Sequence, residues 1–354
     1  MKFEQGPPIN SNEEPTNKAE KVAFSREEFE ERFAEKLTTG ENGIEYNRFT
    51  PEELITNKPV IFIGGFGQGS STYHDELYDL AESGRDVIFS NPIRGVEGEK
   101  SDELLAFQAK YDLPDIIMNK VAAVEEIIRD LGAQEVDLAG HSQGGAMVSL
   151  LSALNPGLVK NLTLLNPAGF SQNESRTGLI AGFAKDKIDS VLHKPQAEIE
   201  PEVKAALSAA TKNAGMSFGK EIAGNPKDIP FRLNEIGSIA GIDLLPILQD
   251  MKKWGEDDPD SKTVVNLINA HNDGLFTSEM YAERLGEDPS EYVDSWADFS
   301  REGAGHTAPG TEQAGHMAKI EAVQTGLLRQ TLNDNLGDKY SLKQSDQMNI
   351  IEPS

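Results

Sequence analysis

Short apolar runs alternate with amphipathic stretches along the middle of the chain. Residues 59–63 form a continuous apolar run, which is typical of a strand buried on both faces of a parallel sheet, and the mostly apolar runs 86–90, 162–165 and 263–268 predict further strands. Ahead of a further apolar run at 136–139, the apolar side chains recur at spacings of four and three residues and predict a helix that Gly132 ends: Ile117, Val121, Val124, Ile128 and Leu131. Strands alternating with helices predict an α/β fold with a doubly wound, mainly parallel sheet.

The same pattern divides the chain into segments. Ser25 and Glu28 form a capping box that opens a helix through about Leu37, with Phe29 and Phe33 on one face, and an alternating strand follows at 44–49. From Gly169 the strand rhythm is replaced by two or three helices, near 176–192, 198–213 and 230–240, which we interpret as a helical cap inserted between two strands of the sheet. A helix at 243–254, a weaker strand at 296–299 and a final helix at 311–332 complete the core. The predicted parts are a disordered polar lead at 1–22, core at 23–168, cap at 169–240, core at 241–332 and a polar, frayed tail at 333–354.

The sequence Gly140-His141-Ser142-Gln143-Gly144 joins the apolar run at 136–139 to a helix-compatible run of small and apolar residues. A strand, a sharp turn and a helix are the context of a nucleophile elbow, which places Ser142 at the apex in a strained conformation. Gly140 and Gly144 have no Cβ, so the strand and the helix can approach closely. A Gly-x-Ser-x-Gly pentapeptide also occurs by chance, but its position here favours an elbow.

A glycine-rich loop, Gly64-Gly65-Phe66-Gly67-Gln68-Gly69, follows the strand at 59–63. A phosphate-binding loop is one interpretation, but the Lys-Ser/Thr pair of a P-loop is missing. An oxyanion loop, in which glycines let a backbone N–H face the reacting carbonyl, suits a chain that also carries an elbow.

A serine nucleophile needs a histidine base and a carboxylate that orients the histidine. Asp273 directly follows an apolar strand and is the candidate carboxylate, with a turn-forming Asp-Gly as the alternative. Two Ala-Gly-His triplets compete for the base. His306 lies in a glycine-rich loop between a strand and the last helix and is preferred, whereas His316 lies within a helical run.

Composition narrows the range of partners. With 33 basic and 59 acidic residues the formal charge is -26, which disfavours nucleic acids and anionic membranes. Cysteine is absent, and the six histidines show no metal-ligand spacing, so neither a metal nor a cofactor is expected. No apolar run reaches the length of a membrane span and the first residues lack a secretory pattern, so we expect a cytoplasmic protein.

From 44 to 332 the chain resembles the α/β-hydrolase superfamily, whose nucleophile–acid–base order matches Ser142, Asp273 and His306. The resemblance implies an oxyanion hole formed by the backbone N–H groups of Gln143 and Phe66, with Gly67 as the alternative second donor. It also implies that the inserted helices form a cap that selects the substrate. Serine at the apex argues against the branches of the superfamily that use aspartate, the dehalogenases and epoxide hydrolases.

These residues predict a serine hydrolase that cleaves a small-molecule carboxylic ester through an acyl-enzyme intermediate, with apolar cap side chains against the acyl or alkyl group. An amidase or peptidase, a lactonase, a C–C bond hydrolase and an acyltransferase would use the same triad. A non-catalytic binding protein on this fold is a further alternative, against which the intact Ser142, Asp273 and His306 count.

Overall fold

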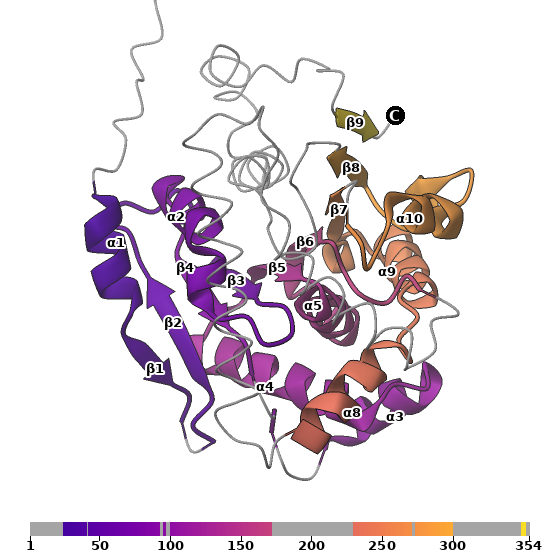
Figure 1. The fold of residues 1–354 in the computed structure, drawn as a ribbon, viewed down its shortest axis with the longest axis horizontal. Coiled ribbons are helices and arrows are strands. Elements are labelled where there is room, and N and C mark those ends of the chain that lie inside the picture. Colours follow the sequence, from indigo (N-terminus) through magenta and orange to yellow (C-terminus); the bar gives the residue numbers. More distant parts are fainter. Residues whose placement is uncertain are drawn as a thin grey trace, which may run out of the picture.

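A nine-stranded sheet organises the described part of the chain in the computed structural model, which covers residues 24–40, 42–92, 95–96, 100–171, 229–270, 273–299 and 348–351 (Figure 1). The strand order is β1-β2-β4-β3-β5-β6-β7-β8-β9. The six strands from β4 to β8 in this order are parallel, and β1, β2 and β9 are antiparallel to their neighbours. The bounds are β1 Lys36–Thr38, β2 Glu45–Phe49, β3 Val60–Ile63, β4 Val87–Ser90, β5 Val136–His141, β6 Val159–Leu165, β7 Val264–Ala270, β8 Ser295–Phe299 and β9 Met348–Ile351.

Helices cover both faces of this sheet. The described helices are α1 Arg26–Phe33, α2 His74–Glu82, α3 Asp102–Lys110, α4 Asp115–Leu131, α5 Gln143–Leu154, α8 Ile229–Ile239, α9 Leu245–Asp257 and α10 Ser278–Leu285, with short 3-10 turns η1 Ser70–Thr72, η3 Pro259–Ser261 and η4 Pro289–Glu291. Apolar side chains of α1 and α2 share one buried cluster with one face of the sheet, and those of α3, α4, α5, α8, α9 and α10 share another with the opposite face. The predicted doubly wound, mainly parallel fold is confirmed.

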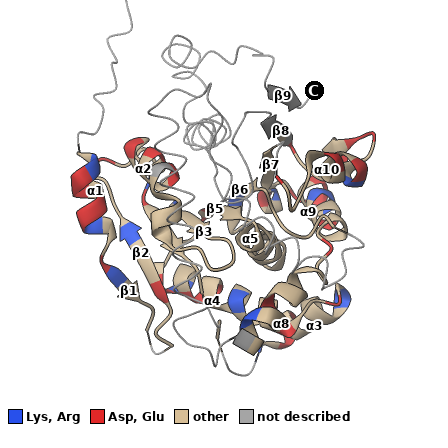
Figure 2. Ribbon diagram, viewed as in Figure 1, with Lys and Arg blue, Asp and Glu red and all other residues tan. Residues whose placement is uncertain are grey.

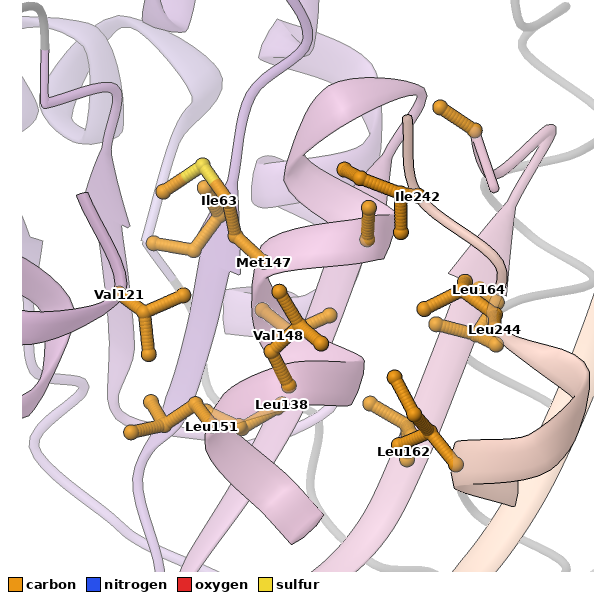
Figure 3. Close-up of a cluster of buried hydrophobic side chains, with 14 of the residues drawn as sticks. Ile63, Val121, Leu138, Met147, Val148, Leu151, Leu162, Leu164, Ile242 and Leu244 are labelled. Carbon is orange, nitrogen blue, oxygen red and sulfur yellow. The ribbon is translucent and has the colours of Figure 1, made fainter. Parts of the chain in front are cut away.

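Successive residues of the central strands feed the two clusters alternately, as the period of two in a strand requires. Ile61 and Ile63 belong to the larger cluster, while Val60 and Phe62 belong to the smaller. The larger cluster surrounds α5, whose Val148 packs among side chains of β5 and β6 (Figure 3). Every residue of β3, β4 and β5 is buried, which explains why these strands do not alternate between apolar and exposed polar residues.

Charge lies on the outer helices. Figure 2 shows Asp, Glu, Lys and Arg along α1 and α10, whereas α5 carries none of them. Because α5 is buried from Gln143 to Ala153, an apolar helix suits its central position.

A buried ion pair lies where the central strands β4 and β5 begin. The Arg85 guanidinium lies 2.5 Å from the Asp137 carboxylate, and both side chains are at most 2% exposed. Asp137 also accepts hydrogen bonds from the backbone N–H and the side-chain amide of Asn161, at 3.1 and 2.8 Å. Asp137 lies at the start of β5, at the end opposite to Ser142.

The sequence-predicted strands all appear, and so does the capping box, where the Ser25 hydroxyl accepts from the Glu28 N–H at 3.1 Å. The first helix was predicted to reach about Leu37 and instead ends at Phe33, because Leu37 belongs to β1, which pairs with β2 in a hairpin. The predicted cap helix near 230–240 and the helix near 243–254 correspond to α8 and α9. The sequence pattern did not identify α2, α3 or α10.

The tail was predicted to be polar and frayed throughout, which is wrong for Met348–Ile351. These residues form β9 beside β8, where the apolar pair at 350 and 351 suits a strand at the sheet edge. The predicted lead at 1–22, the cap helices near 176–192 and 198–213, and the final helix at 311–332 lie outside the described residues. No helix of the described ranges has both the length and the apolar character needed to cross a membrane.

Candidate active site

Ser142 lies at a strained turn between β5 and α5. Its φ of 55° and ψ of -121° place it outside the regions that L-residues ordinarily occupy. The two flanking glycines permit this turn: a Cβ on Gly140 would lie 2.5 Å from the carbonyl oxygen of Gly144, and one on Gly144 would lie 2.7 Å from that of Gly64. This is the geometry expected of a nucleophile elbow.

The glycine-rich loop after β3 packs directly against that elbow. A Cβ on Gly65 would lie 3.2 Å from the Cβ of Ser142. Residues 65–68 form a β-turn closed by the Gln68 N–H donating to the Gly65 carbonyl at 3.1 Å, and Gly67 takes the positive φ of 67° that the third position of a type II turn requires. The turn fixes the Phe66 and Gly67 peptides directly after Gly65, the residue that approaches Ser142, and both are candidates for the second oxyanion donor.

A buried polar junction joins the loop to the elbow. The Tyr73 hydroxyl accepts a hydrogen bond from the Gly65 N–H at 2.7 Å, bonds Gln68 Oε1, and lies 2.8 Å from His141 Nδ1. His141 Nδ1 also lies 3.0 Å from Gln68 Oε1. Since an amide oxygen only accepts, His141 carries its proton on Nδ1 in this arrangement. Burial raises the pKa of Tyr73 well above its ordinary value, so the hydroxyl stays protonated and can donate.

Backbone hydrogen bonds connect Ser142 through β6 to the end of β7. The Ser142 N–H donates to the Leu165 carbonyl, and the Ala168 N–H donates to the Ser142 carbonyl, both at 3.0 Å. Asn166, at a positive φ of 40°, donates from its N–H to the Ile268 carbonyl at 2.8 Å and accepts from the Ala270 N–H at 2.6 Å. The carboxyl ends of these parallel strands therefore form one edge, where open α/β sheets place their sites.

Asp273 lies three residues beyond β7 on this edge and is 2% exposed. Its Oδ1 accepts hydrogen bonds from the backbone N–H groups of Leu275 and Phe276, at 2.7 and 2.9 Å, which fixes the plane of the carboxylate. Its charge also affects Tyr281, whose pKa is raised well above the ordinary value mainly by burial and further by Asp273. Asp273 thus closes a turn and is also held rigidly near the sheet edge. A turn-forming Asp-Gly and a carboxylate that orients the histidine are therefore compatible roles for this residue.

Gln143, the first residue of α5, is fully buried and its side chain contacts a charged group. Lys120 of α4 donates to Gln143 Oε1 at 3.3 Å and forms an ion pair with Glu235 of α8. The sequence analysis did not identify Lys120 or Tyr73 as part of the site. For Lys120 a signal was present, because it lies three residues after Ile117 and four before Val124, on the apolar face of the helix.

The histidine candidates, His306 and His316, lie outside the described residues, so their positions relative to Ser142 stay predictions. Within the described ranges, no group of three or more His, Cys, Asp or Glu side chains is arranged to hold a metal ion.

Comparisons with known proteins agree with this architecture. Residues 58–197 match a family model described as alpha/beta hydrolase fold. A "Serine hydrolase-like protein" from Danio rerio is 27% identical over 117 residues, which are 33% of this chain and 33% of that protein. The matched part thus spans about a third of the length of this curated relative.

Solved structures share the fold over most of the chain. The enol-lactonase from Burkholderia xenovorans LB400 superposes with a TM-score of 0.56 at 14% identity, covering 82% of this chain and 100% of that one. A membrane phospholipase A described as a bacterial virulence factor gives 0.51 at 18% identity, covering 83% and 86%. A structure from a study of carboxylesterases of the thaumarchaeon Nitrososphaera gargenis gives 0.50 at 14% identity, covering 85% and 100%.

At these identities the structural likeness shows the fold, and the family model covers the strand, loop and elbow described above. The sheet order, the strained serine between β5 and α5 and the family match agree, and the chain has the α/β-hydrolase fold.

Proposed function

We propose that this chain is a serine hydrolase that cleaves a small-molecule carboxylic ester through an acyl-enzyme intermediate. The observation that carries the proposal is the strained turn at Ser142 with the glycine-rich loop packed against it. The packing is so close that a Cβ added to Gly65 would lie 3.2 Å from the Cβ of Ser142. A residue keeps a conformation that costs about 1–3 kcal/mol only when the surroundings impose it, and such residues cluster at active sites.

In the proposed reaction the Ser142 hydroxyl attacks the ester carbonyl while His306 accepts its proton. Asp273 orients the histidine and stabilises the imidazolium, a role that suits a carboxylate held by two backbone N–H groups. The backbone N–H groups of Gln143 and of Phe66 donate to the oxyanion, each contributing about 3 kcal/mol to transition-state stabilisation. The His306 imidazolium gives its proton to the alcohol as the ester C–O bond breaks, which leaves the acyl-enzyme. His306 then accepts a proton from water as the water oxygen attacks the acyl carbonyl, and it returns that proton to Ser142 as the acid leaves.

An ester is the first choice of substrate because carboxylesterases and an enol-lactonase, named above, share the fold, and both names denote cleavage of an acyl–oxygen bond. The fold is equally compatible with amide, C–C bond and acyl-transfer chemistry, since the same triad forms the acyl-enzyme in each.

The testing experiment measures hydrolysis of p-nitrophenyl esters from acetate to decanoate, together with labelling by a fluorophosphonate. We expect turnover and labelling in the wild type, both lost in Ser142→Ala. Turnover should fall by at least about 1,000-fold in His306→Ala and Asp273→Asn. His316→Ala is the matched control and should keep its activity.

Loss of activity in His316→Ala instead of His306→Ala would move the base by ten residues along the chain. Labelling of Ser142 without ester turnover would retain the serine enzyme and overturn the ester substrate. If the folded wild type is neither labelled nor active, the proposed catalytic function is wrong.

A further inference from the structure

A buried ion triad connects α4 and α8 beneath the candidate oxyanion hole. Glu235 is fully buried, and its two carboxylate oxygens bind different cations: Oε1 pairs with Lys120, and Oε2 lies 2.8 Å from Arg232. Lys120 and Arg232 are 1% and 4% exposed. The triad therefore fixes the Lys120 ammonium group at a defined place in the interior.

Each cation also touches one of the two residues proposed to donate to the oxyanion. The Lys120 ammonium donates to Gln143 Oε1 at 3.3 Å. The Arg232 guanidinium lies over the Phe66 ring, 5.6 Å from its centroid. One buried triad is thus in contact with both halves of the candidate oxyanion hole.

Stability alone is a weak reason for such a triad. Removing charges from water is costly, and replacing a buried ion pair by apolar side chains of similar size is often neutral or stabilising. The Arg85–Asp137 pair shows that the same chain also buries an ion pair away from the site, at the opposite end of β5. Stability therefore does not explain why the Lys120 triad lies against Gln143.

The sequence of α5 indicates a role for the contact between Lys120 and Gln143. The helix begins Gln143-Gly144-Gly145, so in its first three residues only Gln143 has a side chain by which neighbours can hold the turn. The glycines are required by close packing, since a Cβ on Gly145 would lie 2.8 Å from Pro167. The hydrogen bond from Lys120 fixes this one side chain and, through it, the peptide between Ser142 and Gln143.

We propose that Lys120, held in place by Glu235, is a positioning residue for the oxyanion hole: it orients the Gln143 N–H toward the reacting carbonyl by binding the Gln143 side chain. The inference rests on the proposed serine hydrolase function. It adds that α8 contacts the site indirectly: Glu235 of α8 binds Lys120, and Lys120 binds Gln143.

The test is a double-mutant cycle of Lys120→Met and Gln143→Ala, measured as kcat and KM for a p-nitrophenyl ester. Lys120→Met keeps the length of the side chain and leaves Glu235 paired with Arg232, and Gln143→Ala keeps the backbone N–H. Each single variant should lower kcat by about 10- to 100-fold with KM within about threefold, because small misplacement of a catalytic group has effects of this size. If Lys120 acts through Gln143, the double variant should be no slower than the slower single variant.

Asp137→Asn is the matched control, since it also removes one charge from a buried ion pair. It should lower the melting temperature while leaving kcat per fluorophosphonate-reactive serine unchanged. If Lys120→Met does not fold, Glu235→Gln provides a second test. Glu235→Gln should lower kcat in the wild type but cause no further loss in a protein that already carries Gln143→Ala.

The positioning role is overturned if Lys120→Met keeps kcat within twofold of the wild type, or if its effect multiplies with that of Gln143→Ala. It is also overturned if Asp137→Asn lowers kcat as much, because a general loss of rigidity would then explain both. A wild type that is neither labelled nor active would instead refute the proposed hydrolase function, and the positioning role with it.

Discussion

The carbonyl oxygen of Ile63 occupies the space in which a side chain on Gly144 would begin. The start of α5 is therefore packed backbone to backbone against the end of β3, where the glycine-rich loop starts. This contact sets the distance between the elbow and the loop before any side chain is considered.

Gly144→Ala should consequently disturb both stability and activity. The new methyl group would overlap Ile63 and lie 2.7 Å from the Gly64 carbonyl oxygen, and backbone on both sides cannot move aside cheaply. We expect the free energy of unfolding to fall by about 3 kcal/mol, at the upper end of typical overpacking costs, with loss of fluorophosphonate labelling. Gly40→Ala, where no atom lies within 4 Å of the added Cβ, should change neither quantity in urea unfolding and labelling assays.

Because Ser142 is strained, two inactive variants, Ser142→Gly and Ser142→Ala, should differ in stability. Glycine adopts a φ of 55° without the steric penalty, whereas alanine retains it. Ser142→Gly should therefore exceed Ser142→Ala in free energy of unfolding by about 1 kcal/mol, after allowance for the greater flexibility of glycine in the unfolded chain. Equal stability of the two variants in parallel urea titrations would show that this turn is not strained.

Tyr73→Phe removes the hydroxyl group that joins the loop to the elbow. It leaves the Gly65 N–H without its acceptor in a buried place, so we expect a loss of about 2 kcal/mol in stability. Because the loop is then less firmly held against His141, kcat should fall by about tenfold while KM changes little. Tyr46→Phe, which removes a buried hydroxyl elsewhere, is the control and should keep kcat; an unchanged kcat in Tyr73→Phe would contradict the expectation.

Tyr46 makes stability depend on alkaline pH. Burial and the hydrogen bond to Asp130, at 2.7 Å, raise the pKa of Tyr46 to about 12 from 10.0. The folded protein holds this proton more tightly than the unfolded chain, so the contribution of Tyr46 is complete below pH 10 and is lost as the pH rises toward 12.

Tyr46→Phe should therefore be less stable than the wild type at pH 8, by about 1 kcal/mol for one hydrogen bond, and the difference should shrink between pH 10 and 11.5. Urea unfolding of both proteins across this range measures the difference directly. A difference that stays constant would mean that Tyr46 titrates normally in the folded state.

The sequence by itself determined the strands β2 to β8, the mainly parallel character of the sheet and the position of Ser142 between β5 and α5. Apolar runs such as 60–63 have to be buried on both faces, and a strand, Gly-x-Ser-x-Gly and helix can only meet in a sharp turn. The capping box at Ser25 was equally readable, because the residues that form it are three positions apart. These features depend on neighbours in the chain.

Only the tertiary structure decided the supports of the site. Tyr73 meets His141, and Lys120 meets Glu235, across 68 and 115 positions of the chain. Such contacts are set by how helices from different parts of the chain pack on one sheet, and a tyrosine or a lysine has no local pattern that names its distant partner. The β1 hairpin and β9 illustrate the same limit, since a strand at a sheet edge exists only when its partner strand is in place.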